Sequence, residues 1–220
     1  MYSQDDLKKM AAQAAIACIE EDMVIGVGSG STVHYFIEEL AKIKHKIDAC
    51  VASSEETAKR LKAKGIPVLD MNVAPQISIY VDGADEIYSR GEMKKGGGGA
   101  LTREKIIASY AKKFICIVDE SKMVQYWGDF PIAVEVLPMA RSAVARELMK
   151  LKCSPSYREG FITDNGNIIL DVYQLELLEP KVQENRINQI VGVLENGIFA
   201  NRVADEVFMA TQEGIVHWKN

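Results

Sequence analysis

The sequence predicts an α/β fold built on a mostly parallel sheet and followed by a smaller α+β domain. Short apolar runs alternate with helical patterns up to about residue 122, and this alternation is typical of a parallel sheet covered on both faces. After Phe130 the expected order becomes strand, helix, two strands, helix and strand. The first region is therefore Rossmann-like, and the second matches a ferredoxin-like unit.

The first domain opens with a helix after Ser3, because Ser3 and Asp6 have the spacing of a capping box. Apolar periodicity and turn residues then predict the other elements. They are a strand over 23–27, a helix after Thr32, a strand over 47–52, a helix from Ser53 to Gly65, strands near Val68, Ile79 and Ile115, and a helix over 101–110.

In the second domain, Asn165-Gly166 is a strong hairpin signal before the alternating run 168–173. The other expected elements are a strand over 132–136, a helix over 140–150, a strand near Tyr157, a helix from Pro180 to about 191 and a strand over 193–195. The tail, with Ile198, Phe199 and residues 207–209, is expected to return to the first sheet. We therefore expect domains at 1–130 plus about 197–220, and at about 131–196.

The composition of the chain argues against several classes of protein. The chain has 220 residues, of which 48% are hydrophobic, and a net charge of -5, which argues against binding to nucleic acid or to an anionic membrane. No apolar stretch reaches the roughly 20 residues that span a bilayer, so we expect no membrane and a cytoplasmic protein. The four cysteines and three histidines are scattered. We therefore expect no metal site.

A glycine-rich loop follows the expected strand 23–27. Gly26, Gly28 and Gly30 precede Ser31 and Thr32, which open a helical pattern. A helix N-terminus with nearby hydroxyls favours a phosphate group. The spacing fits neither the dinucleotide fingerprint nor the Walker loop, and a tight structural turn remains the alternative.

A second cluster places two aspartates, a lysine, four glycines and a glutamate within 23 residues. Asp82 and Asp85 follow the apolar run 77–81, and Lys95 precedes Gly96–Gly99 and Glu104. A carboxylate can accept a proton beside a carbonyl while a cation stabilises the resulting oxyanion. Taken singly, each residue has an ordinary structural explanation, such as a helix-end charge for Glu104. Their joint occurrence at expected strand ends favours a site.

These motifs resemble the ribose-5-phosphate isomerase type A family over essentially the whole chain. The matching segments, in order, are Gly26–Thr32, Tyr80–Glu86, Lys95–Glu104, Ser121-Lys122 and Pro138–Ala143. Two positions depart from the common pattern. Ser29 replaces a threonine, which keeps a hydroxyl, and Gly99 replaces a frequent alanine, which we expect to loosen the loop slightly.

The resemblance implies interconversion of ribose 5-phosphate and ribulose 5-phosphate in the pentose phosphate pathway, without a cofactor and in a homo-oligomer, a dimer or tetramer. It implies that Glu104 is the proton acceptor and that Asp82, Asp85 and Lys95 line the sugar. We assign Lys95 to the oxyanion and Asp82 to relaying the hydroxyl proton. The other implied substrate-binding residues are Ser29, Gly30, Ser31, Thr32, Gly83, Ala84, Gly96, Gly97, Gly98, Lys122 and Lys8.

Two other classes of protein could use similar parts. A sugar-phosphate sensor domain would need no proton acceptor and would normally carry a DNA-binding helical module, which we do not expect here. A CoA-transferase-like enzyme would use a nucleophilic glutamate, so hydroxylamine trapping that labels Glu104 would favour it.

Overall fold

The computed structural model describes all 220 residues, and the chain divides into two compact units. Unit 1 comprises Met1–Ala84, Arg103–Met123 and Ala204–Asn220, and unit 2 comprises Asp85–Thr102 and Val124–Val203. Unit 2 includes residues 85–102, which the sequence analysis assigns to the first domain. The predicted domain boundaries stay a prediction.

Unit 1 is built on a six-stranded sheet in the order β13-β12-β6-β3-β1-β2. Its strands are β1 (Met23–Val27), β2 (Ile47–Ala52), β3 (Ile79–Asp82), β6 (Lys113–Asp119), β12 (Glu206–Thr211) and β13 (Gly214–Lys219). The first five run parallel, and β13 joins β12 as an antiparallel hairpin. The expected mostly parallel sheet is therefore confirmed, with its carboxyl ends along one edge.

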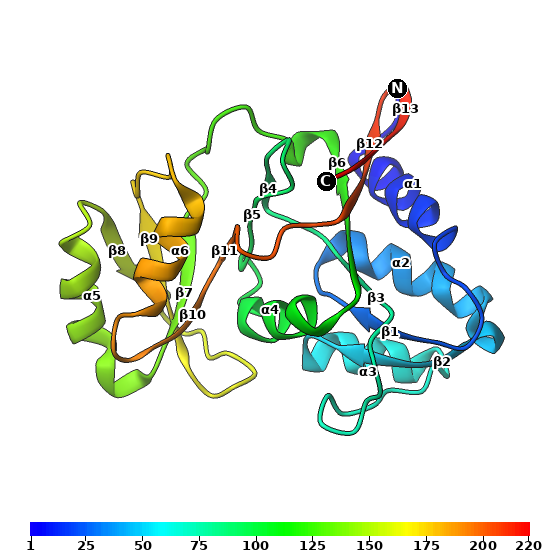
Figure 1. The fold of residues 1–220 in the computed structure, drawn as a ribbon, viewed down its shortest axis with the longest axis horizontal. Coiled ribbons are helices and arrows are strands. Elements are labelled where there is room, and N and C mark those ends of the chain that lie inside the picture. Colours follow the sequence, from blue (N-terminus) through cyan, green and yellow to red (C-terminus); the bar gives the residue numbers. More distant parts are fainter. The chain divides into compact units, whose positions relative to one another are not determined.

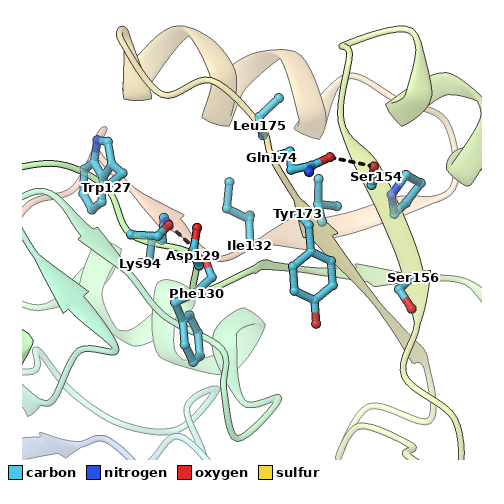
Figure 2. Close-up of a pocket in the computed structure, with 13 residues that line it drawn as sticks. Lys94, Trp127, Asp129, Phe130, Ile132, Ser154, Ser156, Tyr173, Gln174 and Leu175 are labelled. Carbon is cyan, nitrogen blue, oxygen red and sulfur yellow. Dashed lines mark hydrogen bonds between the residues drawn. The ribbon is translucent and has the colours of Figure 1, made fainter.

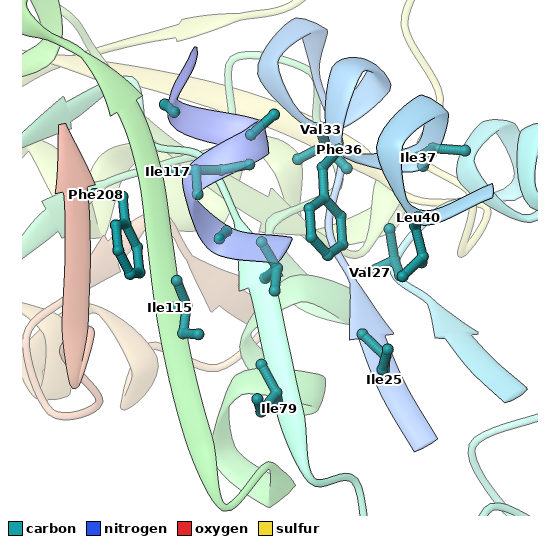
Figure 3. Packing of buried hydrophobic residues seen from close by; sticks show 14 of the residues in the cluster. Ile25, Val27, Val33, Phe36, Ile37, Leu40, Ile79, Ile115, Ile117 and Phe208 are labelled. Carbon is teal, nitrogen blue, oxygen red and sulfur yellow. The ribbon is translucent and has the colours of Figure 1, made fainter. Parts of the chain in front are cut away.

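Helices cover both faces of this sheet. On one face lie α1 (Gln4–Ile16) and α2 (Ser31–Lys42), which Figure 1 shows side by side. Figure 3 shows the core beneath them, where Phe36 and Leu40 pack over Ile25. Gly26 faces the other way, because a Cβ there would meet Ile107 of α4 (Leu101–Tyr110). Helix α3 (Glu55–Ala63) follows β2.

Unit 2 contains a four-stranded antiparallel sheet in the order β10-β7-β9-β8. Along the chain its elements are β7 (Ile132–Val136), α5 (Arg141–Met149), β8 (Ser154–Tyr157), β9 (Ile168–Tyr173), α6 (Pro180–Asn188) and β10 (Val193–Asn196). This order and topology are ferredoxin-like, as expected. A small separate sheet, also in unit 2, joins β4 (Glu86–Ile87), β5 (Met93–Lys94) and β11 (Ile198–Phe199).

The chain also contains three short 3₁₀ helices, η1 (Lys44–Lys46), η2 (Glu120–Lys122) and η3 (Pro138–Ala140). The capping box predicted for the first helix is present, with Ser3 as N-cap and Asp6 as its partner. No helix combines the length and the apolar character needed to cross a bilayer.

Several expected element boundaries are wrong, for physical reasons. The N-cap of α3 is Ser54, because the Ser53 amide donates to the Val27 carbonyl and extends the sheet by one residue. Val68 makes only an isolated bridge to Cys50, since the preceding Pro67 has no N–H to continue a ladder.

The tail also differs in part from the expectation. Residues 207–209 do return to the first sheet, in β12. Ile198 and Phe199 instead form β11, which pairs with β5 inside unit 2. Helix α6 ends at Asn188, three residues before the expected end.

Candidate active site

The loop between β1 and α2 presents the N-terminus of a helix at the carboxyl edge of the unit 1 sheet. Gly30 is the N-cap, and Ser31 and Thr32 form the start of α2. Ser31 and Gly30 are exposed, while Ser29 and Thr32 are half-buried. The first amides of a helix have no intrahelical acceptor, so this loop is suited to an anion.

Two buried carboxylates meet this loop through Ser29. The Ser29 amide donates to Asp82 Oδ1 over 3.0 Å, and the Ser29 hydroxyl donates to Glu104 Oε1 over 2.5 Å. Asp82 has no exposed surface, and Glu104 is 4% exposed. The loop therefore brings together Asp82 from the end of β3 and Glu104 from the first turn of α4.

Asp82 is held by further donors within unit 1. The Gly83 amide donates to its Oδ1 over 2.7 Å, and the Tyr80 hydroxyl donates a short hydrogen bond to its Oδ2. Burial, together with the nearby charges of Asp82 and Glu104, raises the pKa of Tyr80 well above its ordinary value. Tyr80 therefore acts as a neutral donor that keeps the carboxylate in one orientation.

Tyr80 was not predicted as a polar contributor to the site, because it counts among the apolar residues of its strand. Its spacing of two from Asp82 was the available signal, since residues at that spacing lie on the same face of a strand. Thr57 was also missed. Its side chain is buried, and it donates to the Gly28 carbonyl over 2.7 Å, which holds the loop in place.

In unit 2, Asp85 and the glycine run form a second part of the predicted site. Asp85 Oδ2 accepts the Gly97 amide over 2.9 Å, so the aspartate fixes the glycine loop. Gly97 and Gly98 are exposed, whereas Gly96 is buried. Ala84 is half-buried and ends the first segment of unit 1, directly before Asp85.

The two lysines of the β5 region have different surroundings. Lys94 Nζ pairs with Glu86 over 3.0 Å and donates to the carbonyls of Gly128 and Phe130. Figure 2 shows Lys94 beside the segment around Trp127, where it lines a pocket of about 620 Å³. Lys95 is 4% exposed, and its Nζ lies 5.5 Å from the Phe199 ring centroid. Lys94 is therefore structural, and none of the predicted site residues lines that pocket.

The remaining candidates, Lys8 and Lys122, lie in unit 1. Lys8 is on α1, with its Nζ 3.8 Å from Asp5 Oδ1. Lys122 ends η2, which follows β6 and is capped by Asp119 through the Ser121 amide. Both side chains are half-buried. No group of three or more His, Cys, Asp or Glu side chains is placed to hold a metal ion.

A buried carboxylate pair beside a helix N-terminus, at the carboxyl ends of parallel strands, defines an α/β enzyme suited to acid–base chemistry on a small anion. A family model described as Ribose 5-phosphate isomerase A (phosphoriboisomerase A) matches residues 49–214. The chain belongs to this family. Membership does not favour the sensor domain or the CoA-transferase-like enzyme considered from the sequence.

Individual relatives extend this match to the whole chain. The ribose-5-phosphate isomerase A of Legionella pneumophila (strain Lens) is 63% identical over 214 residues, covering 97% of this chain and 99% of the relative. The crystal structure of ribose 5 phosphate isomerase A from Neisseria gonorrhoeae has a TM-score of 0.97 at 44% identity, covering 100% and 98% of the two chains.

A further solved structure is of a D-ribose-5-phosphate isomerase in complex with phospho-erythronic acid. It has a TM-score of 0.94 at 38% identity and covers 100% of each chain.

Proposed function

We propose that the protein interconverts D-ribose 5-phosphate and D-ribulose 5-phosphate in the non-oxidative branch of the pentose phosphate pathway. Family membership gives the reaction, and the contact of Ser29 with both Asp82 and Glu104 is the observation that carries the site assignment. One short loop thus joins a phosphate-type helix terminus to two carboxylates. A phosphorylated sugar needs this combination, because one end must be held while the other reacts.

Glu104 is the proposed base. Its carboxylate takes the proton from C2 of the aldose and returns it to C1, so one group serves both half-reactions through a cis-enediolate. The proton on the C2 hydroxyl leaves as the ketose carbonyl forms, and the C1 oxygen gains a proton to become a hydroxyl. Asp82 relays this oxygen-bound proton. No external oxidant or reductant is required, because the reaction only moves a hydrogen from C2 to C1 within the same molecule.

Lys95 is the proposed electrostatic partner of the enediolate oxygens. An ammonium group that faces developing negative charge lowers the barrier more than it strengthens substrate binding. Asp85 and the backbone of Gly96, Gly97 and Gly98 are proposed to line the sugar. The bond from the Gly97 amide to Asp85 supports a fixed loop geometry for this purpose.

The phosphate end of the substrate is assigned to the start of α2. Ser29, Gly30, Ser31 and Thr32 supply amides and hydroxyls, and the helix dipole favours the negative charge. Lys8 and Lys122 are the proposed cationic helpers, and Gly83 and Ala84 complete the set of contacts. Phospho-erythronic acid, bound by the related isomerase, carries both a phosphate and a carboxylate, and a carboxylate resembles an enediolate in planarity and charge. That complex supports a site with both features.

We further infer a cytoplasmic homo-oligomer, a dimer or tetramer, as the resemblance implies. Apolar side chains exposed on unit 2 support this inference, because Met139 is 96% exposed and Val191 is 93% exposed. Sedimentation analysis of the purified protein at several concentrations measures the state. A monomer at every concentration would contradict the inference.

The test of the proposed function compares wild type with Glu104→Gln in deuterated water. NMR follows ketose formation from ribose 5-phosphate and the deuterium that enters C1. We expect Glu104→Gln to lose nearly all turnover but to keep substrate binding, because the amide has the same shape but cannot accept the proton. Glu206→Gln is the matched control, since Glu206 is also 4% exposed but lies at the first residue of β12. Unchanged turnover in Glu104→Gln would refute the assignment.

A further inference from the structure

The loop between β8 and β9, residues 158–167, covers one face of the four-stranded sheet in unit 2. Alternate residues of β7 point to opposite faces, and Ile132, Val134 and Val136 pack in the core with α5 and α6. Ala133 belongs to a separate cluster with Leu101, Ile169 and Phe161. The face that carries Ala133 and Glu135 is thus covered by this loop together with the glycine run and the start of α4.

Glu135 is the polar centre of this second face. It has no exposed surface, and its Oε1 accepts bonds from the side chains of Thr163 over 2.7 Å and Asn167 over 2.9 Å. Asn165 Nδ2 donates to both of its oxygens. The Thr102 hydroxyl, in the first turn of α4, donates a short hydrogen bond to Oε2. One buried carboxylate therefore joins the loop to the start of the helix that carries Glu104.

Arg158 makes the corresponding link to the glycine run. Its guanidinium forms an ion pair with Asp171, with Nε 2.8 Å from Oδ2, and it lies 5.3 Å from the Phe161 ring centroid. The remaining Nη1 donates to the carbonyls of Gly96 and Gly97, each over 3.2 Å. Because Asp171 and the Phe161 ring hold the planar guanidinium in place, it defines the position of these two carbonyls.

Phe161 completes the contact at Gly99. Gly99 has a φ of +77°, and a Cβ built there would lie 2.2 Å from Cζ of Phe161. The glycine therefore lets an aromatic ring pack directly against the loop backbone. The space that a side chain at this position would take is filled by the ring, and the expectation that glycine loosens the loop stays a prediction.

We propose that Glu135 and Arg158 are positioning residues for the isomerase reaction, acting through Thr102 on the first turn of α4 and through the Gly96 and Gly97 carbonyls on the glycine loop. The inference rests on the proposed roles of that loop and of Glu104. A misplacement of about 1 Å in a reacting group can cost about 100-fold in rate. Residues 158–167 thus belong to the catalytic apparatus, although none of them is assigned a contact with the substrate.

The first test is Thr102→Val, which replaces one hydroxyl by a methyl of similar size and leaves Glu135 three side-chain partners. We expect kcat to fall about tenfold with KM within about twofold of wild type, because the base is displaced while the binding residues remain. Thr211→Val is the matched control, since the Thr211 hydroxyl donates over 3.0 Å to the Gly214 carbonyl in the β12–β13 hairpin. It should keep wild-type kcat.

Two further variants separate positioning from simple stability. Glu135→Gln should lower kcat at least as much as Thr102→Val, whereas Glu206→Gln, an equally conservative change at a buried carboxylate, should keep kcat at temperatures where it is folded. Arg158→Lys keeps the charge opposite Asp171 but lacks the planar fork, so we expect KM to rise about fivefold or more as the glycine loop shifts.

Amide hydrogen exchange of residues 96–104, measured by mass spectrometry, gives a readout that does not depend on activity. We expect faster exchange there in Thr102→Val and Glu135→Gln than in their controls. The proposal would be overturned if Thr102→Val had a kcat within about twofold of wild type and unchanged exchange. This result decides the proposal even if Glu135→Gln does not fold. An inactive wild type would instead refute the proposed function, and exchange would still decide whether Glu135 holds the segment.

Discussion

Replacing Gly28 by alanine should disable the enzyme by displacing Asp82. A Cβ at position 28 would lie 2.0 Å from both Cγ and Oδ1 of Asp82, so the carboxylate must retreat by about 1.4 Å to reach the 3.4 Å of ordinary contact. Gly28 itself cannot move instead. Its amide donates to the Val81 carbonyl over 2.9 Å, and its carbonyl accepts the Thr57 hydroxyl over 2.7 Å.

The magnitude follows from what the carboxylate loses. A shift of this size breaks the bonds from the Ser29 and Gly83 amides to Asp82, and it moves a proposed proton relay by more than 1 Å. We expect kcat to fall about 100-fold and the free energy of unfolding to fall by about 1–3 kcal/mol. Initial rates with ribose 5-phosphate and thermal unfolding by circular dichroism measure the two effects.

Gly128→Ala is the control for crowding of a buried carboxylate. A Cβ at position 128 would lie 2.5 Å from Glu86 Oε1, in the structural pair with Lys94. This variant should lose stability but keep kcat within a few-fold of wild type. The reasoning is refuted if folded Gly28→Ala turns over substrate within about twofold of wild type.

Four further predictions concern single side chains. Lys95→Ala should lower kcat more than it raises KM, and Ser31→Ala should chiefly raise KM. Steady-state kinetics measures both effects, and the reversed pattern would mean that the two residues have each other's proposed role. Tyr80→Phe should lower the free energy of unfolding by about 1–3 kcal/mol, because Asp82 loses a buried donor; an unchanged melting temperature would contradict this. Although burial opposes it, hydrogen bonds from the lysine and histidine side chains around Glu206 lower its pKa from 4.5 to about 2. A lowered pKa contributes stability above the unfolded value, so wild type should lose stability as pH falls from about 4.5 to 2, and Glu206→Gln should show a flatter profile in acid denaturation.

Most of the fold could be predicted because local pattern and tertiary structure agree. The capping box at Ser3 depends on neighbouring residues only, and it is found where expected. The loop after β1 is also found where expected, because glycines and the start of a helical pattern mark it in the sequence. The pairing of Ile198 and Phe199 depends instead on a partner about a hundred residues earlier, in β5. Apolar character alone does not distinguish one sheet from another, so the expectation for these two residues failed.

The candidate site shows the same division. Asp82 and Glu104 could be found from their place at element ends, because strand ends and helix starts are visible in the sequence. The buried hydrogen bonds that hold the first turn of α4 in place could not be found in this way. Glu135 is the one charged residue in the apolar strand β7, and the sequence gives no sign of its four partners. They come from the start of α4 and from a loop about thirty residues later. Hydrogen-bond partners at such separations are set by topology.

The turn between β4 and β5 restricts how the length of the chain can change at this point. Glu86 pairs with Lys94 across this hairpin, and the turn is closed by the Tyr88 amide bound to the Glu92 carbonyl. Because side chains alternate along a strand, adding or removing one residue here would exchange the surroundings of Lys94 and Lys95. The Lys94 ammonium, which now pairs with Glu86, would move to the opposite face of the strand and leave that buried carboxylate without its partner. Insertions and deletions in this turn should therefore be tolerated only in even numbers.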